Sequence, residues 1–511
     1  MEPRIETRRG KRLLVEKKKT PPTATPSTLT PATVQASTQA GAPIRNFTGS
    51  LTVGEGGPIV LQDIYFLERM QHALRERIPE RFVHAKGAGA HGYFEVTNDI
   101  TSHCKASLFS EVGKKTKCMV RLSTVDGERG SSDNERDARG FAVKFYTDEG
   151  IWDLLSLSTA VFFIRDPILF PHLAHCQKRN PSSNLKDPNA FWDFMTIREE
   201  SVHMLMMIFA DRGIPDGYQH MNGYSGNTFT MVNTKQEAVY VRFKWKTNQG
   251  VQNITNPKDP RLNDLDYSTQ LLYDGIKRGE YPSWTLQYQY MTPAQAQSPK
   301  YKSIAFDVTK VWPHTDFPLN DIGKLTLNAN PNNYFAEVEQ AAFSPSRLVP
   351  GIEGSPDQLL QGRIFAYNDT QVYRLGVNYN QLPVNRTQHR PHNYQRDGAQ
   401  AIIDPSANEV NYYPNSFNGP QPDNHTLHSI TVTGDVKRYD TDHMDNFTQA
   451  TVFYNKILNA DMRGRLGFNI AENLKGANTK LQMKAVAMFN KVNAELAKTI
   501  TKYLSTPQVL Y

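Results

Sequence analysis

One histidine is followed by a run of residues too small to crowd it. His84 lies on a stretch predicted to be extended, and residues 85–90 read Ala-Lys-Gly-Ala-Gly-Ala. Gly87 and Gly89 permit close approaches that other residues resist, so His84 could lie directly against a flat ligand or a buried small molecule. A single imidazole has no mechanism by itself, and the same pattern is compatible with an ordinary core or surface histidine.

A second pair of candidate residues lies far downstream. Arg363 and Tyr367 are four residues apart, a spacing at which two side chains meet on one face of a helix. A guanidinium beside a phenol favours the phenolate by Coulomb attraction and hydrogen bonding, and a phenolate can hold the iron of a haem. His84 and Tyr367 together predict the two sides of a haem, although Tyr367 could also be a buried tyrosine bonded to an arginine.

Seven stretches carry a resemblance to a known family. They follow the family's order within residues 50–500, and they are Arg77–Arg81, the segment around His84, Gly92–Thr97, Arg139–Tyr146, Phe162–Pro167, Asp211–Asp216 and Asn333–Gln340. On these stretches the chain resembles the haem catalases, in particular the small-subunit type that binds NADPH. The resemblance implies an α+β catalase fold with an antiparallel eight-stranded β-barrel, a wrapping region and a C-terminal helical domain.

The resemblance also implies the residues of a haem b site. Tyr367 would be the axial ligand of the iron, Arg363 its partner, and Ser123 the hydroxyl that orients the distal base His84. Three arginines match positions that pair with the haem propionates, and each could instead form an ordinary ion pair: Arg81, Arg121 and Arg374. Three apolar residues match the groups over the distal haem face: Val83, Phe162 and Phe170.

A further set of residues resembles the NADPH pocket of this family. The matching residues are His203, Arg212, Asn222, Tyr224, Lys246, Trp312, His314, Gln449 and Phe453. Arg212 and Lys246 would face phosphate groups. The match is partial, because Met207 and Ala210 stand where the family more often has an aromatic ring and a hydroxyl. The same residues could form a helix surface that packs against the barrel and binds nothing.

The distal pocket departs from the family pattern. Catalases carry an asparagine between the Trp-Asp-Leu and Phe-Phe-Ile-Arg-Asp-Pro motifs, and the ungapped register from Trp152 to Phe162 places Leu157 there. The amide would bond to peroxide while His84 moves a proton between its two oxygens. Loss of such a donor typically costs about 10²- to 10³-fold in rate. His91 is a second departure, at a position where the family usually has an apolar aromatic residue.

These departures predict a diverged haem oxidoreductase that uses peroxide or superoxide to oxidise a small organic molecule. Such an enzyme would resemble the catalase-like chanoclavine synthase of ergot alkaloid biosynthesis, which carries out an oxidative cyclisation. Two alternatives stay open. The first is an ordinary catalase in which Ser158 or water replaces the amide. The second is a haem or NADPH binding protein without turnover. His84, Arg363 and Tyr367 argue against it, since a sensor need not keep a distal base with its orienting Ser123.

Composition excludes several other classes of protein. The 511 residues have 39% hydrophobic content, enough for a large core. The formal net charge is +7, of which residues 1–50 contribute +6 through nine Lys and Arg against three Glu. The basic character therefore belongs to a tail, and no nucleic-acid groove is predicted. Three cysteines without CxxC spacing favour a reducing compartment over a zinc site or a disulfide framework.

Periodicity divides the chain into blocks. Period-two alternation at residues 239–246, and similar runs at 118–125, 140–146 and 284–290, predict antiparallel strands, whereas residues 191–210 favour a helix. Helical spacing returns after Asn446. The predicted parts are a basic and then Thr- and Pro-rich disordered arm at 1–50, a threading arm at 51–85, a haem-binding barrel at 86–330, a wrapping region with the Tyr367 helix at 331–445, and a helical domain at 446–511.

The sequence also gives expectations for the cellular location and the oligomeric state of the protein. No run approaches the roughly 18 apolar residues that cross a membrane, and no secretory signal follows the first charges. We expect an intracellular protein, cytoplasmic or peroxisomal, although Gln508–Tyr511 is not a signal of the Ser-Lys-Leu type. The long wrapping region implies, by resemblance, a homotetramer.

Overall fold

The computed structural model describes residues 34–403, 410–423 and 427–506. It divides the chain into two compact units, Met1–Ile78 and Pro79–Tyr511. Most of the predicted basic arm and the segment Gln508–Tyr511 lie outside the described residues. Within the described ranges, no helix is both long and apolar enough to cross a membrane.

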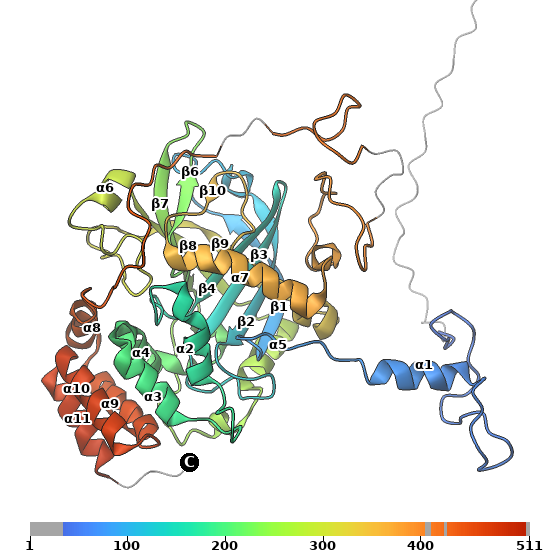
Figure 1. Cartoon of the computed structure of the whole chain (residues 1–511), viewed down its shortest axis with the longest axis horizontal. Helices are drawn as coiled ribbons and strands as arrows, with labels where there is room; N and C mark the ends of the chain where they lie inside the picture. The colour runs from blue at the N-terminus through green and yellow to red at the C-terminus, as the bar shows by residue number, and fades with distance from the viewer. Residues whose placement is uncertain (1–33, 404–409, 424–426, 507–511) are drawn as a thin grey trace, which may run out of the picture. The chain divides into compact units, whose positions relative to one another are not determined.

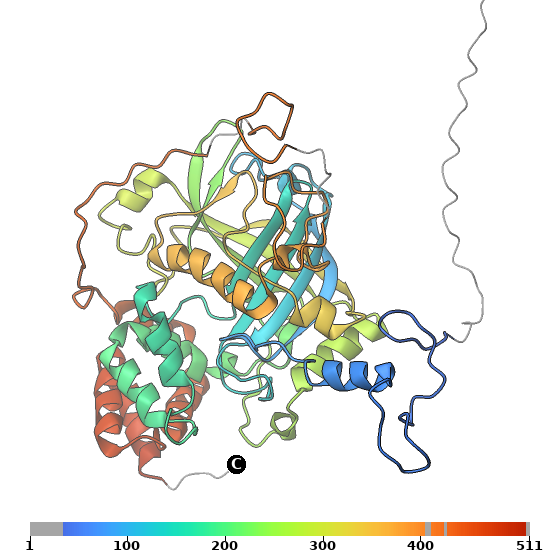
Figure 2. The ribbon, with the colours of Figure 1, turned by 45° about the vertical axis from the view of Figure 1, so that its right-hand side comes forward.

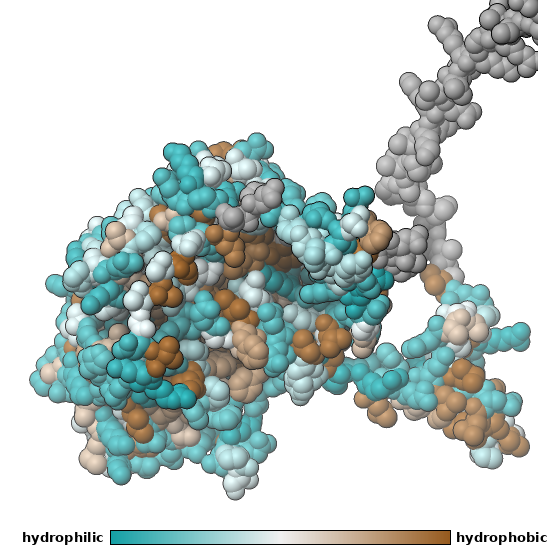
Figure 3. All heavy atoms as spheres, turned by 45° about the horizontal axis from the view of Figure 1, so that its top comes forward, coloured by the Kyte–Doolittle hydropathy of each residue, from teal (hydrophilic) through white to brown (hydrophobic). Residues whose placement is uncertain are grey.

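The described part of the first unit, residues 34–78, has one helix and almost no core. Helix α1 (Ile64–Ala73) starts at Asp63, whose carboxylate accepts hydrogen bonds from the backbone N–H groups of Phe66 and Leu51. None of the residues of α1 is buried. Leu61 and Leu74 are 84% and 88% exposed, and Figure 3 shows hydrophobic side chains on the surface of this unit. A segment that buries so little apolar surface gains little stability from its own packing.

An antiparallel barrel forms the centre of the second unit (Figure 1). Its strands follow the order β7-β5-β4-β3-β2-β1-β9-β8, and β8 pairs with β7 to close the ring. The eight strands are β1 (Gly87–Val96), β2 (Lys115–Thr124), β3 (Arg139–Thr147), β4 (Gly150–Leu157), β5 (Gly223–Tyr224), β7 (Ala238–Thr247), β8 (Ser283–Met291) and β9 (Asn320–Ala329). Two short strands, β6 (Phe229–Val232) and β10 (Ile352–Glu353), extend the sheet beside β7.

Large aromatic side chains fill the barrel. Phe141 stacks on Trp245 with ring centroids 5.6 Å apart, and Phe145 stacks on Trp152 at 4.6 Å. These four rings are buried with exposures of 0%. Because side chains occupy the interior, as expected for a barrel of eight strands, a ligand site has to lie outside the barrel wall.

Strand β7 shows the predicted period of two, and such alternation favours one buried and one solvent-exposed face. The polar face of β7 is only partly exposed. Tyr240 and Arg242 are buried, although Lys246 on the same face is exposed. The loop that follows α6 (Pro293–Gln297) covers them, and Arg242 donates to the carbonyl oxygen of Asp307 at 3.0 Å and lies over the Trp312 ring. Because the loop buries the polar side chains on this face of the strand, those side chains need hydrogen-bonding partners within the protein.

Helices cover one side of the barrel. Helices α2 (Phe170–Gln177), α3 (Pro188–Ile197) and α4 (Val202–Phe209) pack with the C-terminal helices α8 (Thr448–Val452), α9 (Ala460–Leu474), α10 (Thr479–Val492) and α11 (Ala494–Leu504) (Figures 1 and 2). The single helix predicted over 191–210 is broken at Arg198, whose ψ is 76°. Its guanidinium bonds to the buried Glu200 in the 3-10 turn that follows. Helix α5 (Tyr267–Arg278) packs against β1 and β9.

One long helix crosses the outside of the barrel. Helix α7 (Gln358–Leu375) begins at the N-cap Asp357, which accepts from the Leu360 N–H group, and lies across the strands in both ribbon views (Figures 1 and 2). Tyr367 on this helix packs against a buried hydrophobic cluster that includes Leu155 of β4 and Phe343. The surface in Figure 3 is hollowed, and hydrophobic side chains gather in the hollow.

Candidate active site

All eleven residues that the sequence predicts for the catalytic and haem site line one cavity. The cavity has a volume of about 290 Å³, and its walls come from the segment before β1, from β2, β3 and β4, and from α7. The predicted residues in its wall are Arg81, Val83, His84, Arg121, Ser123, Leu157, Phe162, Phe170, Arg363, Tyr367 and Arg374. Segments nearly 300 residues apart in the chain therefore meet at one site.

His84 has a special backbone conformation. Its φ is 67°, in the left-handed region, so the predicted extended conformation is wrong at this residue. A residue with a side chain pays for such a conformation with about 1–3 kcal/mol of strain, which is commonly found at functional sites. The imidazole lies against Gly140 of β3, where a Cβ atom would stand 2.6 Å from Nδ1. Gly140, and neither Gly87 nor Gly89, is the glycine that makes room for this ring.

Hydrogen bonds fix the tautomer of His84. Its Nδ1 lies 3.0 Å from the Thr124 carbonyl oxygen and 3.0 Å from the Ser123 hydroxyl. A carbonyl oxygen can only accept, so Nδ1 carries the hydrogen and Nε2 keeps its lone pair. Burial and the nearby Arg121 guanidinium lower the pKa of His84 to about 3. The imidazole is neutral at pH 7 and can act as a general base.

Leu157 faces the same side of the sheet as this imidazole. It is the last residue of β4 and lies directly opposite Gly140 in the β3–β4 ladder. Ser156 lies opposite the core residue Phe141, on the face of the sheet that points into the barrel. Ser158 is not part of the cavity wall, and its hydroxyl accepts a hydrogen bond from the Arg139 N–H group. Ser158 is therefore not placed to replace an amide at position 157, whereas Ser156 is among the residues that line the cavity, and its buried hydroxyl has no hydrogen-bond partner.

A chain of hydrogen bonds supports Tyr367 from the other side. Arg363 Nη2 donates to the Tyr367 hydroxyl at 3.1 Å, and its Nη1 donates to Asn227. The Asn227 amide in turn donates to the Asp357 carboxylate at 3.0 Å. Burial raises the pKa of Asp357, and hydrogen bonds from Thr228 and Asn227 act against this. Asn227 and Asp357 were missed from the sequence, although an Asp before a helical run is an N-cap signal.

Three arginines give the cavity an excess of positive charge. Arg81 and Arg374 donate to the carbonyl oxygen of Glu339, and Arg121 donates to that of His84 at 2.7 Å. Each guanidinium keeps one buried nitrogen without a hydrogen-bond partner, namely Arg81 Nη1, Arg121 Nε and Arg374 Nε. Arg81 Nη1 also lies 3.7 Å from the buried carboxylate of Glu339, which offsets part of the positive charge. Burial lowers the pKa of Arg81 well below its usual value, and lowers that of Arg374 to about 10.

Whether a haem fits this cavity can be judged from the three arginines and from the apolar wall. A buried guanidinium nitrogen without a hydrogen bond is costly, and carboxylates are its natural partners. A haem presents two carboxylates on one edge and a flat apolar body, and Val83, Phe162 and Phe170 supply apolar wall. Phe170 packs edge-to-face on Phe82 with centroids 6.2 Å apart. The donor set, the apolar wall and an arginine-bonded phenol therefore fit a haem.

The predicted NADPH residues fall into two groups. His203, Arg212 and Phe453 meet where α4 faces the C-terminal helices, with the Arg212 guanidinium 5.7 Å from the Phe453 ring centre. Burial, Lys310 and Arg212 lower the pKa of His203 to about 3, and its Nδ1 is buried without a partner.

The second group lies nearer to β5. Asn222 is 3.5 Å from the Tyr224 hydroxyl, and Lys246 is exposed on β7. The exposed His314 follows the buried Trp312 by two residues. The Gln449 amide bonds to both the N–H and the carbonyl of Val311, at 2.8 and 3.0 Å, so part of this set holds the chain together.

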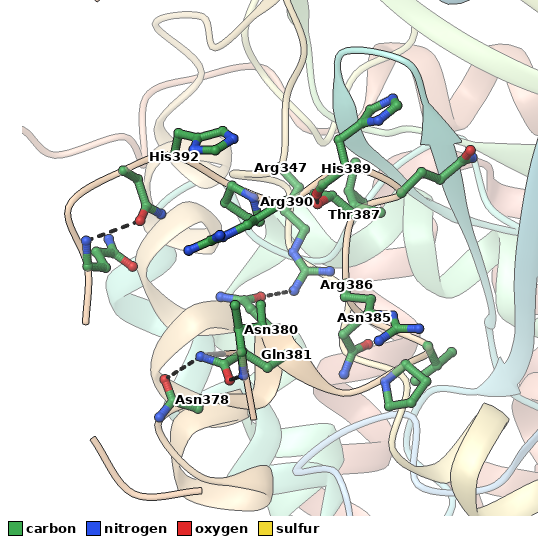
Figure 4. Close-up of a pocket in the computed structure, with 18 of the residues that line it drawn as sticks. Arg347, Asn378, Asn380, Gln381, Asn385, Arg386, Thr387, His389, Arg390 and His392 are labelled. Atoms are coloured by element: carbon green, nitrogen blue, oxygen red, sulfur yellow. Dashed lines mark hydrogen bonds between the residues drawn. The ribbon is translucent and has the colours of Figure 1, made fainter. Parts of the chain in front are cut away.

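A larger cavity lies among the loops that follow α7. Its volume is about 1190 Å³, and residues 377–397 form much of its wall (Figure 4). Arg347, Arg386 and Arg390 line it together with His389 and His392. Arg347 reaches across to the Asn380 side chain, the contact drawn as a dashed line in Figure 4. This cavity shares none of its lining residues with the cavity at His84.

A closed barrel, a neutral imidazole and an arginine-bonded tyrosine around an arginine-rich cavity define a haem enzyme of oxidoreductase type. Comparison with known proteins gives the family. Residues 37–419 match the family model described as Catalase, and residues 440–504 match the model described as Catalase-related immune-responsive. The chain belongs to the catalase family.

Individual relatives agree with this assignment. The chain is 53% identical to a catalase of Drosophila melanogaster over 476 residues, covering 92% of this chain and 94% of the relative. It is 52% identical to a catalase of Cavia porcellus over 474 residues, covering 92% and 89%. A fungal catalase crystal structure superposes with a TM-score of 0.88 at 42% identity, covering 92% of this chain and 96% of that one. The predicted catalase fold is confirmed.

Proposed function

We propose that the protein is a haem-dependent catalase that converts two molecules of hydrogen peroxide into O₂ and two molecules of water. The neutral His84, with its Nδ1–H group held by Thr124 and Ser123, carries this proposal. A non-catalytic haem protein would not need an oriented base with a free Nε2 atom. The catalase family and the catalases among its relatives favour this alternative over a diverged oxidase.

The residues of the cavity divide the chemistry between them. Tyr367 would hold the iron of a haem b and Arg363 would stabilise its phenolate, while Arg81, Arg121 and Arg374 would hold the haem carboxylates. When bound, the haem supplies the two-electron redox chemistry. His84 Nε2 takes a proton from one peroxide oxygen and returns it to the other, so that water can leave. Ser123 and Thr124 keep Nδ1 protonated, which maintains the basic nitrogen on the peroxide side.

Leu157 limits this activity. A leucine offers no hydrogen bond to a peroxide oxygen, and Ser158 lies outside the cavity wall with its hydroxyl bonded to the Arg139 N–H group. Loss of a preorganised donor costs on the order of 10²- to 10³-fold in rate. We therefore propose a slow catalase.

Leu157 also supports a second candidate function. A less polar cavity with slow disproportionation favours reduction of one peroxide by an organic molecule. In that reaction the organic molecule loses two protons and two electrons, and the peroxide takes them up to become two molecules of water. Superoxide as oxidant and the narrower prediction of a chanoclavine synthase-like cyclisation in alkaloid biosynthesis gain no support from the catalases of Drosophila melanogaster and Cavia porcellus.

Two further features of the predicted enzyme remain proposals. NADPH would bind beside Arg212, where His203 keeps an unpartnered nitrogen. Homotetramer formation would cover the hydrophobic side chains that the chain exposes after α7. A cytoplasmic or peroxisomal address also remains a proposal, to be checked by fractionating cells that make the protein.

One substitution separates the candidate functions. Purified protein and its Leu157→Asn variant are compared for a Soret band and for O₂ release from peroxide. Restoring the amide should raise O₂ release about 10²-fold or more, and His84→Ala should abolish it in both backgrounds. Fast release by the unchanged protein would contradict the slow-catalase proposal. No rise with Leu157→Asn, combined with peroxide-dependent oxidation of phenols or indoles, would favour the second candidate.

A further inference from the structure

His91 stands at a break in the β1–β9 ladder. It pairs with Ala329, whereas Gly92 pairs with Leu327, so the register shifts between the two residues. A bulge of this kind redirects the side chain at the break. The His91 imidazole points to Glu337, and the distance from Nε2 to the carboxylate oxygen Oε2 is 2.6 Å. The two side chains are 21% and 25% exposed.

Glu337 belongs to the short π-helical turn Phe335–Glu339. Its other carboxylate oxygen accepts hydrogen bonds from the backbone N–H groups of Asn332 and Asn333, at 3.1 and 3.0 Å. Burial acts to raise the pKa of Glu337, but the hydrogen bonds from His91 and the backbone outweigh it and lower the pKa. A single carboxylate thus ties the start of the turn to strand β1.

The end of the same turn holds the arginines of the cavity. Arg81 Nη2 donates to the carbonyl oxygens of Val338 and Glu339, both at 3.0 Å. Arg374 Nη1 also donates to Glu339. Two more contacts hold the turn against β1. The Tyr334 hydroxyl donates to the Gly87 carbonyl oxygen at 2.6 Å. The Val338 side chain packs so closely on Gly89 that a Cβ atom there would stand 2.7 Å from it.

We infer that His91 is a positioning residue for the cofactor. By holding Glu337, it fixes the turn whose carbonyl groups orient Arg81 and Arg374 toward the haem carboxylates. The inference rests on the proposed haem site. A guanidinium that donates to two carbonyl groups follows any shift of the turn, because those bonds set its direction. An apolar side chain at position 91 would leave Glu337 without its side-chain partner.

The test compares variants of the complete haem-loaded protein. His91→Leu removes the bond to Glu337, and His91→Gln keeps a donor. Transfer of haem to excess apomyoglobin is followed at the Soret band, and amide exchange of residues 335–341 is followed by mass spectrometry. We expect His91→Leu to release haem about tenfold faster or more and to exchange faster in this segment, and His91→Gln to restore both properties toward the unchanged protein.

His103→Leu is the matched control. His103 Nδ1 lies 2.8 Å from the Tyr288 hydroxyl, and neither residue lines the cavity. Unchanged haem release in His91→Leu, or an equal acceleration in His103→Leu, would overturn the inference. A protein that holds haem but releases no O₂ would contradict the catalase proposal alone. If the protein holds no haem, the catalase proposal fails. In that case unchanged amide exchange in His91→Leu would still show that His91 does not hold the turn.

Discussion

His84 combines a left-handed backbone conformation with an Nδ1 atom that makes two hydrogen-bonding contacts. Both features help to hold the imidazole in its neutral form. The φ of 67° brings the ring against Gly140, and the Thr124 carbonyl and Ser123 hydroxyl take up the Nδ1–H group. Burial is the main cause of the lowered pKa of His84, and the positive charges of Arg121, Arg363 and Arg81 lower it further. The positive charge that would bind the haem carboxylates therefore also helps to keep the His84 imidazole deprotonated.

The depressed pKa of His84 predicts how stability depends on acid. The folded pKa is about 3 and the unfolded value about 6.5. The contribution of the neutral His84 to the free energy of unfolding is fully present above pH 6.5. It is lost as the pH falls toward 3, because in this range the unfolded chain binds a proton on His84 and the folded protein does not. Thermal unfolding at pH 7 and 4.5 should show that His84→Gln loses less stability on acidification than the unchanged protein, by at least about 1.4 kcal/mol.

The matched control for this prediction is Ser123→Ala. That variant keeps the imidazole and its bond to Thr124. It should therefore retain the acid sensitivity of the unchanged protein. Equal acid loss in His84→Gln and the unchanged protein would show that His84 does not carry this dependence.

Sequence motifs predicted the cavity residues well because each carries its own local signal. His84, Ser123 and Leu157 could be placed by counting along ungapped matches, and all three line the cavity. The Asn227 contact could not be predicted, since Asn227 lies 136 positions before Arg363 and no local pattern links them. The left-handed φ of His84 was also missed, because a histidine carries no signal for that conformation.

The covering elements were predicted less well than the strands. Period-two alternation marks β7, yet burial of Tyr240 and Arg242 depends on a loop some 60 residues away, as the bond from Arg242 to the Asp307 carbonyl shows. The break at Arg198 depends on the buried Glu200 and on its contact with Arg165. Tertiary contacts decided both outcomes, and local periodicity cannot encode them.

Helix α4 and the C-terminal helices provide the element at which NADPH binding can be tested. Arg212 and Lys310 are the two cations that act on His203, and the Arg212 guanidinium lies over the Phe453 ring. A charge-assisted hydrogen bond is worth about 1.5–3 kcal/mol, so Arg212→Gln should weaken NADPH binding about tenfold or more. Nucleotide fluorescence during titration measures the affinity.

Arg278→Gln serves as the control for that titration. Arg278 is an exposed arginine at the end of α5 and is paired with Glu280. Its replacement should leave the affinity for NADPH unchanged. If millimolar NADPH does not bind to the unchanged protein, the NADPH proposal is wrong, and His203 and Arg212 serve only the packing of the helices.

At the level of the whole molecule, exposed hydrophobic side chains point to assembly. The segment between α7 and α8 exposes Phe417, Leu427, Val432 and Val436, with Leu427 at 80% and Val432 at 76%. Exposed apolar side chains that gather into one contiguous patch commonly mark an interaction site. Copies of the chain would remove them from water, at about 25 cal/mol for each Å² buried.

Light scattering after size exclusion should therefore give four times the mass of one chain at micromolar concentration. Val432→Asp with Val436→Asp should shift the protein toward smaller species, because a carboxylate in an apolar contact must be desolvated without a partner. Val112→Asp, at a valine that is 58% exposed outside this segment, should leave the mass unchanged. A monomeric unchanged protein would contradict the tetramer. A tetramer that tolerates both aspartates would show that the segment between α7 and α8 lies outside the interface.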